Sequence, residues 1–146
     1  MQNSPYEQQP YGQPSGQTPG TSSTGLQENL AALLTYIFIP ITSIIFLVVE
    51  KSSRLVRFHA MQALLLGVGM FVLMIVLSIV MTVVIGVAAA ASSTLAGIVG
   101  LISMLFWLVL PIGMLIVWVL CLVKAYQGQM FKLPIIGNIA EGLVSK

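Results

Sequence analysis

The sequence predicts an all-α membrane protein, a three-helix transmembrane bundle with a tail before it and a surface helix after it. Of its 146 residues, 58% are hydrophobic and only 7% are charged. The segment from Phe58 to Val123 holds no Asp, Glu, Lys or Arg. A soluble domain carries about 25% charged residues, and a small one exposes much of its surface. Lipid is therefore the expected solvent for most of this chain.

Residues 1–27 differ in composition from the rest and are rich in Gln, Pro, Gly, Ser and Thr. Such a segment buries too little apolar surface to offset its ordering entropy, so we expect a disordered tail. It could be a ligand for a proline- or tyrosine-binding module, but a solvated tail is the simpler interpretation. The membrane domain is expected to cover residues 28–146.

The first predicted span covers residues 30–49, which contain no charge. Thr24 and Gln27 have the spacing of a capping box before it. A stretch of about 20 residues covers the hydrocarbon core. Pro40 removes the hydrogen bond to the Tyr36 carbonyl, so a nearby hydroxyl or a neighbouring helix must satisfy that carbonyl. A re-entrant segment is the alternative to a crossing.

The long uncharged region fits two further spans, at about 60–87 and 97–123, with a break near residues 88–94. Gly128 can stop the last of them and Pro134 prevents a simple continuation. The apolar residues of 134–144 then fall on one helical face, which indicates a short helix lying on the membrane surface.

The basic residues cluster in two segments and set the expected orientation. They are Lys51, Arg54 and Arg57 in the first loop, and Lys124, Lys132 and Lys146 near the C-terminus. Three spans place both segments on one side, which the positive-inside rule makes cytoplasmic. The N-terminal tail lacks Lys and Arg and would then be exported. We expect a plasma (inner) membrane location.

The candidate binding motif lies where the charged loop leads into the second span, and we call it the doorway motif: Arg54, Arg57, Phe58, His59, Met61 and Gln62. Long basic side chains reach headgroup phosphates while their stems lie on apolar surface. His59 and Gln62 are three residues apart and share a helical face. That face could bond a neighbouring helix or a lipid phosphate, although ordinary interfacial anchoring is the simpler interpretation.

Small residues recur every fourth position along the second span: Ser78, Thr82, Gly86 and Ala90. Such stripes let helices approach closely. We therefore expect this stripe to pack within the protein or between copies.

No catalytic constellation is visible in the sequence. It has one His, one Cys, no Asp and four Glu, so no Ser-His-acid set, carboxylate pair or metal cluster can be assembled in the membrane. We expect no enzyme activity, cofactor or metal. The net charge of +2, without a basic stripe, argues against nucleic-acid binding.

The segment "VRFHAMQALLL" resembles the twenty-kilodalton chloroplast import component of the Tic complex and its bacterial relatives. It is also similar to the small bacterial membrane family called domain of unknown function 4870. Support comes from "NLAALLTYI" and from "AYQGQMFKLPIIGNIAE", which holds Gly128, Lys132, Pro134 and Gly137. The resemblance implies a non-enzymatic subunit or scaffold of a protein translocation assembly in a bacterial inner membrane. The alternative is a homo-oligomeric channel or passive transporter. The expected partners are the lipid bilayer and either other membrane proteins or further copies of the chain.

Overall fold

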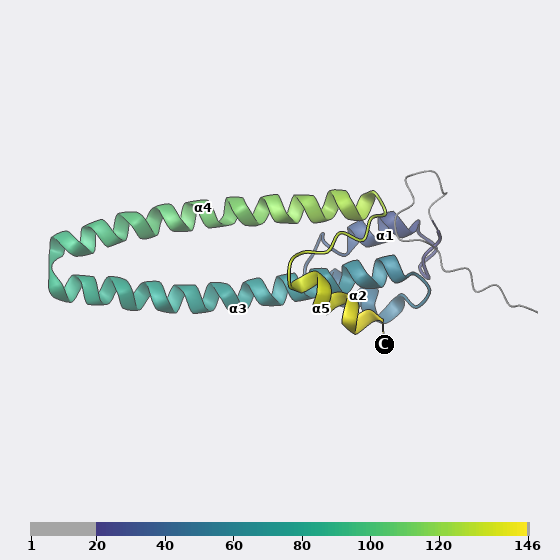
Figure 1. The fold of residues 1–146 in the computed structure, drawn as a ribbon, viewed down its shortest axis with the longest axis horizontal. Coiled ribbons are helices and arrows are strands. Elements are labelled where there is room, and N and C mark those ends of the chain that lie inside the picture. Colours follow the sequence, from purple (N-terminus) through teal and green to yellow (C-terminus); the bar gives the residue numbers. More distant parts are fainter. Residues whose placement is uncertain (1–19, 146) are drawn as a thin grey trace, which may run out of the picture.

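The computed structural model describes residues 20–145, and all of its regular elements there are helices except one isolated β-bridge. The helices are α1 (Glu28–Leu34), α2 (Ile41–Val49), α3 (Arg54–Ala91), α4 (Ser93–Tyr126) and α5 (Ile136–Val144). Helices α3 and α4 form a long antiparallel hairpin, and α1, α2 and α5 gather at its open end (Figure 1). We call these three short helices and the segments that join them the headpiece.

Helices α3 and α4 are both long and apolar enough to cross a membrane. They contain the predicted spans 60–87 and 97–123 and extend beyond them at both ends. The predicted break between the spans, residues 88–94, is reduced to the single residue Ser92, because the alanines before it favour helix. Ser92 caps α4 by accepting a 3.0 Å hydrogen bond from the Leu95 N–H.

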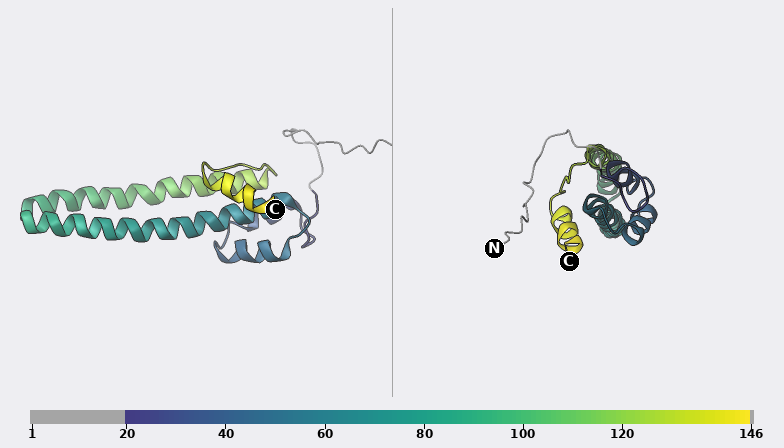
Figure 2. Two further views of the ribbon diagram at one scale, coloured as in Figure 1. Left: turned by 60° about the horizontal axis from the view of Figure 1, so that its bottom comes forward. Right: turned by 90° about the vertical axis from the view of Figure 1, so that its right-hand side faces the viewer.

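The first predicted span does not form as one helix, because residues 30–49 are divided between the short helices α1 and α2. Helix α2 begins directly after Pro40, which cannot donate the hydrogen bond that would continue α1. In the turn between the two helices, the carbonyl of Thr35 accepts hydrogen bonds from the hydroxyls of Ser43, at 2.9 Å, and Thr42, at 3.1 Å. Both helices lie beside the N-terminal part of α3 (Figure 2). Because both are short, the described residues contain two helices long enough to span a membrane, α3 and α4.

The last residues of the predicted tail, 20–27, form a hydrogen-bonded turn in the structure. Ser22 N–H donates to the Leu26 carbonyl at 2.8 Å, and Glu28 N–H donates to the Gly20 carbonyl at 2.9 Å. The capping box does not form, because this turn places Gln27 directly before α1 without a side-chain cap. Residues 1–19, for which disorder and module binding were expected, lie outside the described residues.

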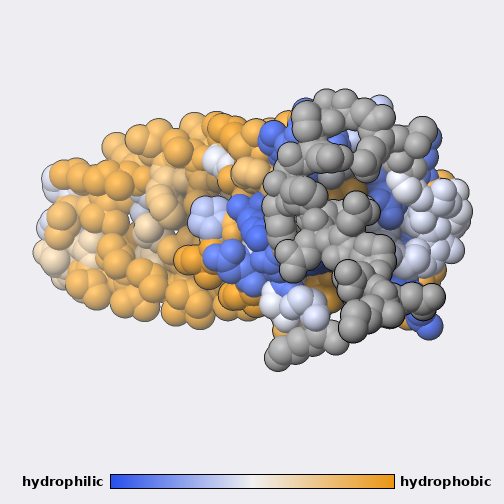
Figure 3. Space-filling view, turned by 45° about the vertical axis from the view of Figure 1, so that its right-hand side comes forward, coloured by the Kyte–Doolittle hydropathy of each residue, from blue (hydrophilic) through white to orange (hydrophobic). Residues whose placement is uncertain are grey.

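Polarity divides the molecule along its length. The far part of the hairpin presents an apolar surface, and hydrophilic residues gather towards the headpiece (Figure 3). Side chains such as Phe71 and Met104 are 68% and 72% exposed. Removing such surface from water is favourable at about 25 cal/mol per Å², so this part of the hairpin is suited to lipid.

Helix α5 lies where the sequence predicts a short helix, residues 134–144, but begins later, at Ile136. Its position on a membrane surface stays a prediction. Its small residues Gly137 and Ala140 are buried, and it packs against α3. Ile139 and Leu143 remain about half exposed. The apolar face is therefore shared between the protein core and the surface, because α3 covers only part of it.

Candidate functional site

Three polar side chains are fully buried where the headpiece meets α3: Tyr36, His59 and Gln62. The Tyr36 hydroxyl lies 3.1 Å from Nδ1 of His59, and Nε2 of Gln62 donates to the same hydroxyl at 3.2 Å. His59 and Gln62 share one face of α3, as their spacing predicts. In the structure, the turn between α1 and α2 therefore lies against this face.

The same two side chains hold the loop that joins α4 to α5. His59 Nε2 lies 3.0 Å from the Gln129 carbonyl, and Gln62 Nε2 donates to the Phe131 carbonyl at 3.1 Å. Gln62 Oε1 accepts from the Leu133 N–H at 3.3 Å. Because Nε2 of His59 faces a carbonyl oxygen, the neutral ring must carry its proton on Nε2. Nδ1 can then accept a hydrogen bond from the Tyr36 hydroxyl.

Helix α4 joins this network through Trp118 and Cys121. The indole N–H of Trp118 donates a 2.9 Å hydrogen bond to the Tyr36 carbonyl, which Pro40 leaves without its helical donor. This is the neighbouring-helix contact that the proline requires. Cys121 is buried, with its sulfur 3.9 Å from Gln62 Nε2. We call Tyr36, His59, Gln62 and Trp118 the junction network.

Sequence reasoning found His59 and Gln62 but missed Tyr36 and Trp118. The signal for Tyr36 was available, because a tyrosine within an apolar stretch needs a hydrogen-bond partner when it is buried. The partner itself could not be identified, since Trp118 lies 82 residues further along the chain.

The remaining doorway residues do not act as one motif. Phe58 is buried with its ring edge-on to His59, the two centroids being 5.3 Å apart. Met61 and Arg57 are half-buried, and Arg54 is exposed near Glu141. The helical repeat therefore divides the doorway into a buried polar face and a basic outer face.

The predicted C-terminal motif shapes the loop before α5. Gly128 has φ +69°, a conformation that favours glycine and ends α4. A Cβ on Gly137 would lie 2.7 Å from Cα of Lys132, so the close approach of these backbones requires glycine. Lys132 Nζ pairs with Glu141 at 2.7 Å. Pro134 is exposed two residues before the start of α5.

The small-residue stripe faces away from α4. Ser78, Thr82, Gly86 and Ala90 are all exposed in the described chain. The hydroxyls of Ser78 and Thr82 bond carbonyls of their own helix, each at 2.8 Å. The partly buried residues along this part of α3 have a spacing of four and three: Met70, Met74, Leu77 and Met81. These longer side chains face the interior of the hairpin. Packing of the small-residue stripe, including packing between copies of the chain, stays a prediction.

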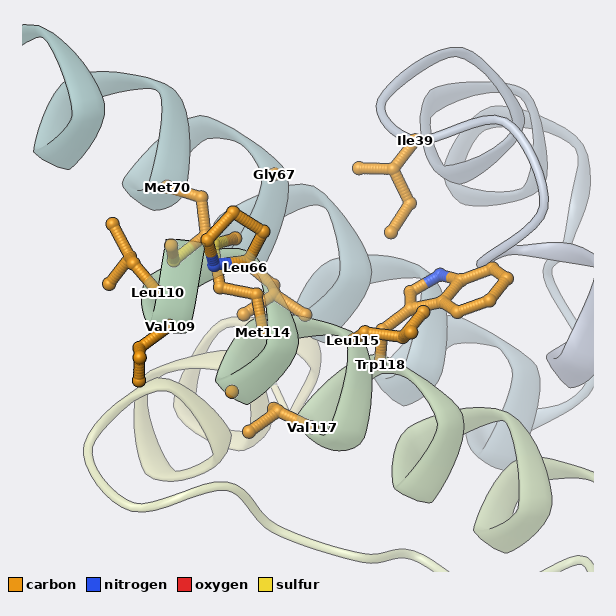
Figure 4. Close-up of a pocket in the computed structure, with 12 residues that line it drawn as sticks. Ile39, Leu66, Gly67, Met70, Val109, Leu110, Met114, Leu115, Val117 and Trp118 are labelled. Carbon is orange, nitrogen blue, oxygen red and sulfur yellow. The ribbon is translucent and has the colours of Figure 1, made fainter. Parts of the chain in front are cut away.

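An apolar groove of about 770 Å³ lies between α3 and α4 beside the headpiece (Figure 4). Its lining includes Ile39 from the α1–α2 turn, Leu66 and Met70 from α3, and Met114 and Trp118 from α4. The Ile39 side chain lies against Gly67, where an added Cβ would collide with it. Gly67 therefore lets the turn close one end of the groove.

A buried carboxylate fastens the N-terminal turn to the link before α3. Glu50 accepts hydrogen bonds from the N–H and hydroxyl groups of Ser23 and Ser52 and from the Ser53 N–H, all at 2.8–3.0 Å. Burial favours the neutral form, but the bonds from Ser53, Ser23 and Ser52 outweigh it and lower the pKa of Glu50 to about 2. Glu50 is therefore an ionised structural group at neutral pH.

Sequence comparisons place the chain among membrane proteins. An archaeal UPF0132 membrane protein from Methanocaldococcus jannaschii is 38% identical over 122 residues, covering 84% of this chain and 93% of the relative. A UPF0132 membrane protein from Archaeoglobus fulgidus is 42% identical over 116 residues, covering 80% of this chain and 94% of the relative. No solved structure matches the chain.

These findings overturn the resemblance to the Tic import component and to domain of unknown function 4870. The sequence model that matches residues 27–140 is that of the magnetosome magnetite crystal formation protein family. The relatives are archaeal, so a bacterial inner membrane and a translocation assembly lose their support. The doorway motif suggested the wrong family because its buried residues belong to the junction network. A short motif does not distinguish such a packing role from a role in binding. The chain is a membrane protein and belongs to the magnetosome magnetite crystal formation protein family.

Proposed function

We propose that this protein is a non-enzymatic membrane scaffold. The α3–α4 hairpin anchors it in the bilayer, and the headpiece is a rigid platform at one membrane surface. The junction network carries this proposal, because Tyr36, His59 and Gln62 direct their polar atoms at one another and at backbone groups of residues 129–133. Because these polar groups are buried and bonded to one another, they stabilise a single conformation of the headpiece.

The distribution of charge supports a cytoplasmic headpiece. With two spans, the basic residues of the described chain gather at the headpiece end: Lys51, Arg54, Arg57, Lys124 and Lys132. The turn at the far end, residues 91–93, has none. The positive-inside rule then makes the headpiece cytoplasmic. The N-terminal segment would lie on that same side, so it need not be exported.

The family description concerns magnetite crystal formation, and we place this chain in a structural role there. Iron ligation would call on oxygen or imidazole ligands. Glu50 is bonded by three serines, Glu141 pairs with Lys132 and Arg54, and His59 bonds Tyr36 and Gln129. These contacts favour a scaffold over an iron ligand.

A homo-oligomeric channel or passive transporter is the second candidate. The exposed stripe on α3 favours it, because small residues promote close helix association in lipid. A two-helix hairpin cannot enclose a pore alone, so this function needs several copies.

Site-specific photocrosslinking of the full chain in native membranes, read by mass spectrometry, separates the two. A crosslinker at Asn138, exposed on α5, should capture other membrane proteins if the headpiece is a platform, and the double variant His59→Ala, Gln62→Ala should lose them while remaining in the membrane. Unchanged capture in that variant would refute the platform. A crosslinker at Thr82 that captures only this chain, with Val83 as control and ion flux in liposomes, would favour the channel.

A further inference from the structure

A second cavity, of about 350 Å³, lies at the start of α3, outside the junction network and the apolar groove. It brings together residues from the link before α3 and the last turn of α5. Its lining is polar on most sides: Lys51, Ser52, Arg54, Arg57, Val144 and Ser145. A cavity of this volume can hold a phosphate group with a short polar substituent.

The cavity has an excess of positive charge. Arg54 lies 3.5 Å from Glu141, but that carboxylate is held more closely by Lys132, at 2.7 Å. Within residues 20–145, neither Lys51 nor Arg57 has a carboxylate oxygen within 4 Å. The nearby Glu50 directs its carboxylate at serine donors. Two cations on this wall are therefore available to an anion.

The fold adds a further contribution at the same place. The 38-residue helix α3 begins at Arg54, so the positive end of its dipole is directed at the cavity. Guanidinium groups match phosphate oxygens in a bidentate geometry, which a lysine cannot reproduce.

We propose that this cavity binds a phosphate group, and that its source is the headgroup of an anionic phospholipid. The cavity lies beside the first residues of α3, at the basic end of a helix long enough to span a membrane. Basic side chains at the end of a spanning helix reach the headgroup phosphates of the surrounding bilayer. This inference does not depend on the scaffold role, since it concerns which lipid surrounds the protein.

The test measures lipid binding by the purified full-length protein in a zwitterionic detergent. Calorimetric titration uses dihexanoyl phosphatidylglycerol, dihexanoyl phosphatidylcholine and inorganic phosphate as probes. Phosphatidylglycerol should bind more tightly than phosphatidylcholine. The Arg57→Gln variant should weaken phosphatidylglycerol binding about tenfold or more, the effect of losing one charge-assisted hydrogen bond.

Lys124→Gln is the matched control, because Lys124 is basic, lies at the same end of the hairpin and is outside the cavity lining. It should change the affinity for phosphatidylglycerol less than about threefold, in line with one screened surface charge. Equal losses in Arg57→Gln and Lys124→Gln, or equal binding of the two lipids, would overturn the proposal, because general surface charge would then explain binding.

Ser145→Glu protects the test against misfolding of an arginine variant. Ser145 is exposed at the end of α5, so this change should leave the unfolding temperature unaltered and abolish binding by repulsion. Retained affinity in Ser145→Glu would refute the site. Phosphatidylglycerol should also bind more tightly than inorganic phosphate. Equal or tighter binding of inorganic phosphate would overturn the phospholipid as the source of the phosphate group.

Discussion

The side-chain amide of Gln62 pairs with the backbone of Leu133, which lies 71 residues further along the chain. Its Oε1 accepts from the Leu133 N–H at 3.3 Å, while its Nε2 donates to the Phe131 carbonyl at 3.1 Å. One glutamine thus satisfies a donor and an acceptor of the extended loop. Every buried side-chain nitrogen and oxygen in residues 20–145 has a hydrogen-bond partner.

Replacing Gln62 by Leu should destabilise the headpiece. The change leaves the Leu133 N–H and the Phe131 carbonyl without partners, and each unmet group costs about 1–3 kcal/mol. We expect the free energy of unfolding to fall by about 2–4 kcal/mol in detergent micelles, measured by denaturant titration. Gln127→Leu is the control, because Gln127 is exposed, and it should stay within about 0.5 kcal/mol of the unmodified protein. Similar losses in both variants would contradict the network.

Alanine should have opposite effects at two neighbouring glycines of α3. At Gly67 the added methyl group collides with Ile39, whereas at Gly69 it meets open space. Gly67→Ala should therefore lose about 1–3 kcal/mol of unfolding free energy through overpacking. Gly69→Ala should gain up to about 1 kcal/mol from helix propensity.

Thermal unfolding of these variants checks the contact itself. Adding Ile39→Ala to Gly67→Ala removes the colliding side chain and should recover part of the lost stability. A double variant that is no more stable than Gly67→Ala would show that Ile39 is not the obstacle.

Acidification should weaken the attachment of the N-terminal turn through Glu50. The pKa of Glu50 is about 2 in the folded protein, against an ordinary value of 4.5 for a glutamate. A lowered pKa stabilises the fold fully above the unfolded value, so this contribution is present at neutral pH and is lost as the pH falls from about 4.5 towards 2. Unfolding followed by circular dichroism from pH 7 to pH 3 measures the loss.

The matched variants for that experiment are Glu50→Gln and Glu28→Gln. Glu50→Gln should be less stable at pH 7 and should show a flatter dependence between pH 4.5 and pH 3. Glu28→Gln should keep the slope of the unmodified protein. An unchanged slope in Glu50→Gln would assign the acid sensitivity to other groups.

Two spans and three spans make opposite predictions about the N-terminal segment. Single cysteines at Ser15, Ser92 and Gln127 can be labelled in oriented vesicles with a membrane-impermeant maleimide. Two spans place Ser15 and Gln127 on one side and Ser92 on the other. Labelling of Ser15 together with Ser92 would instead restore a third crossing. The native Cys121 is buried and should stay unlabelled, which makes it an internal reference.

The two spanning helices could be predicted from sequence because hydropathy is a local property. A long run without charge has few alternatives to helix in lipid, whatever it packs against. The short C-terminal helix was also predictable, since its apolar period and the preceding Pro134 lie within one short segment. The direction of the small-residue stripe was not, because it depends on which face of α3 meets α4.

The sequence by itself determined the solvent of this protein, its helical class, the two long helices and the clustering of its charge. Only the tertiary structure decided that residues 30–49 form a broken pair of helices. That outcome depends on a carbonyl freed by Pro40, on an indole 82 residues away that bonds it, and on space at Gly67 for Ile39. Hydropathy reports what each residue prefers as surroundings, whereas a hydrogen bond or a steric fit exists only once distant segments have met.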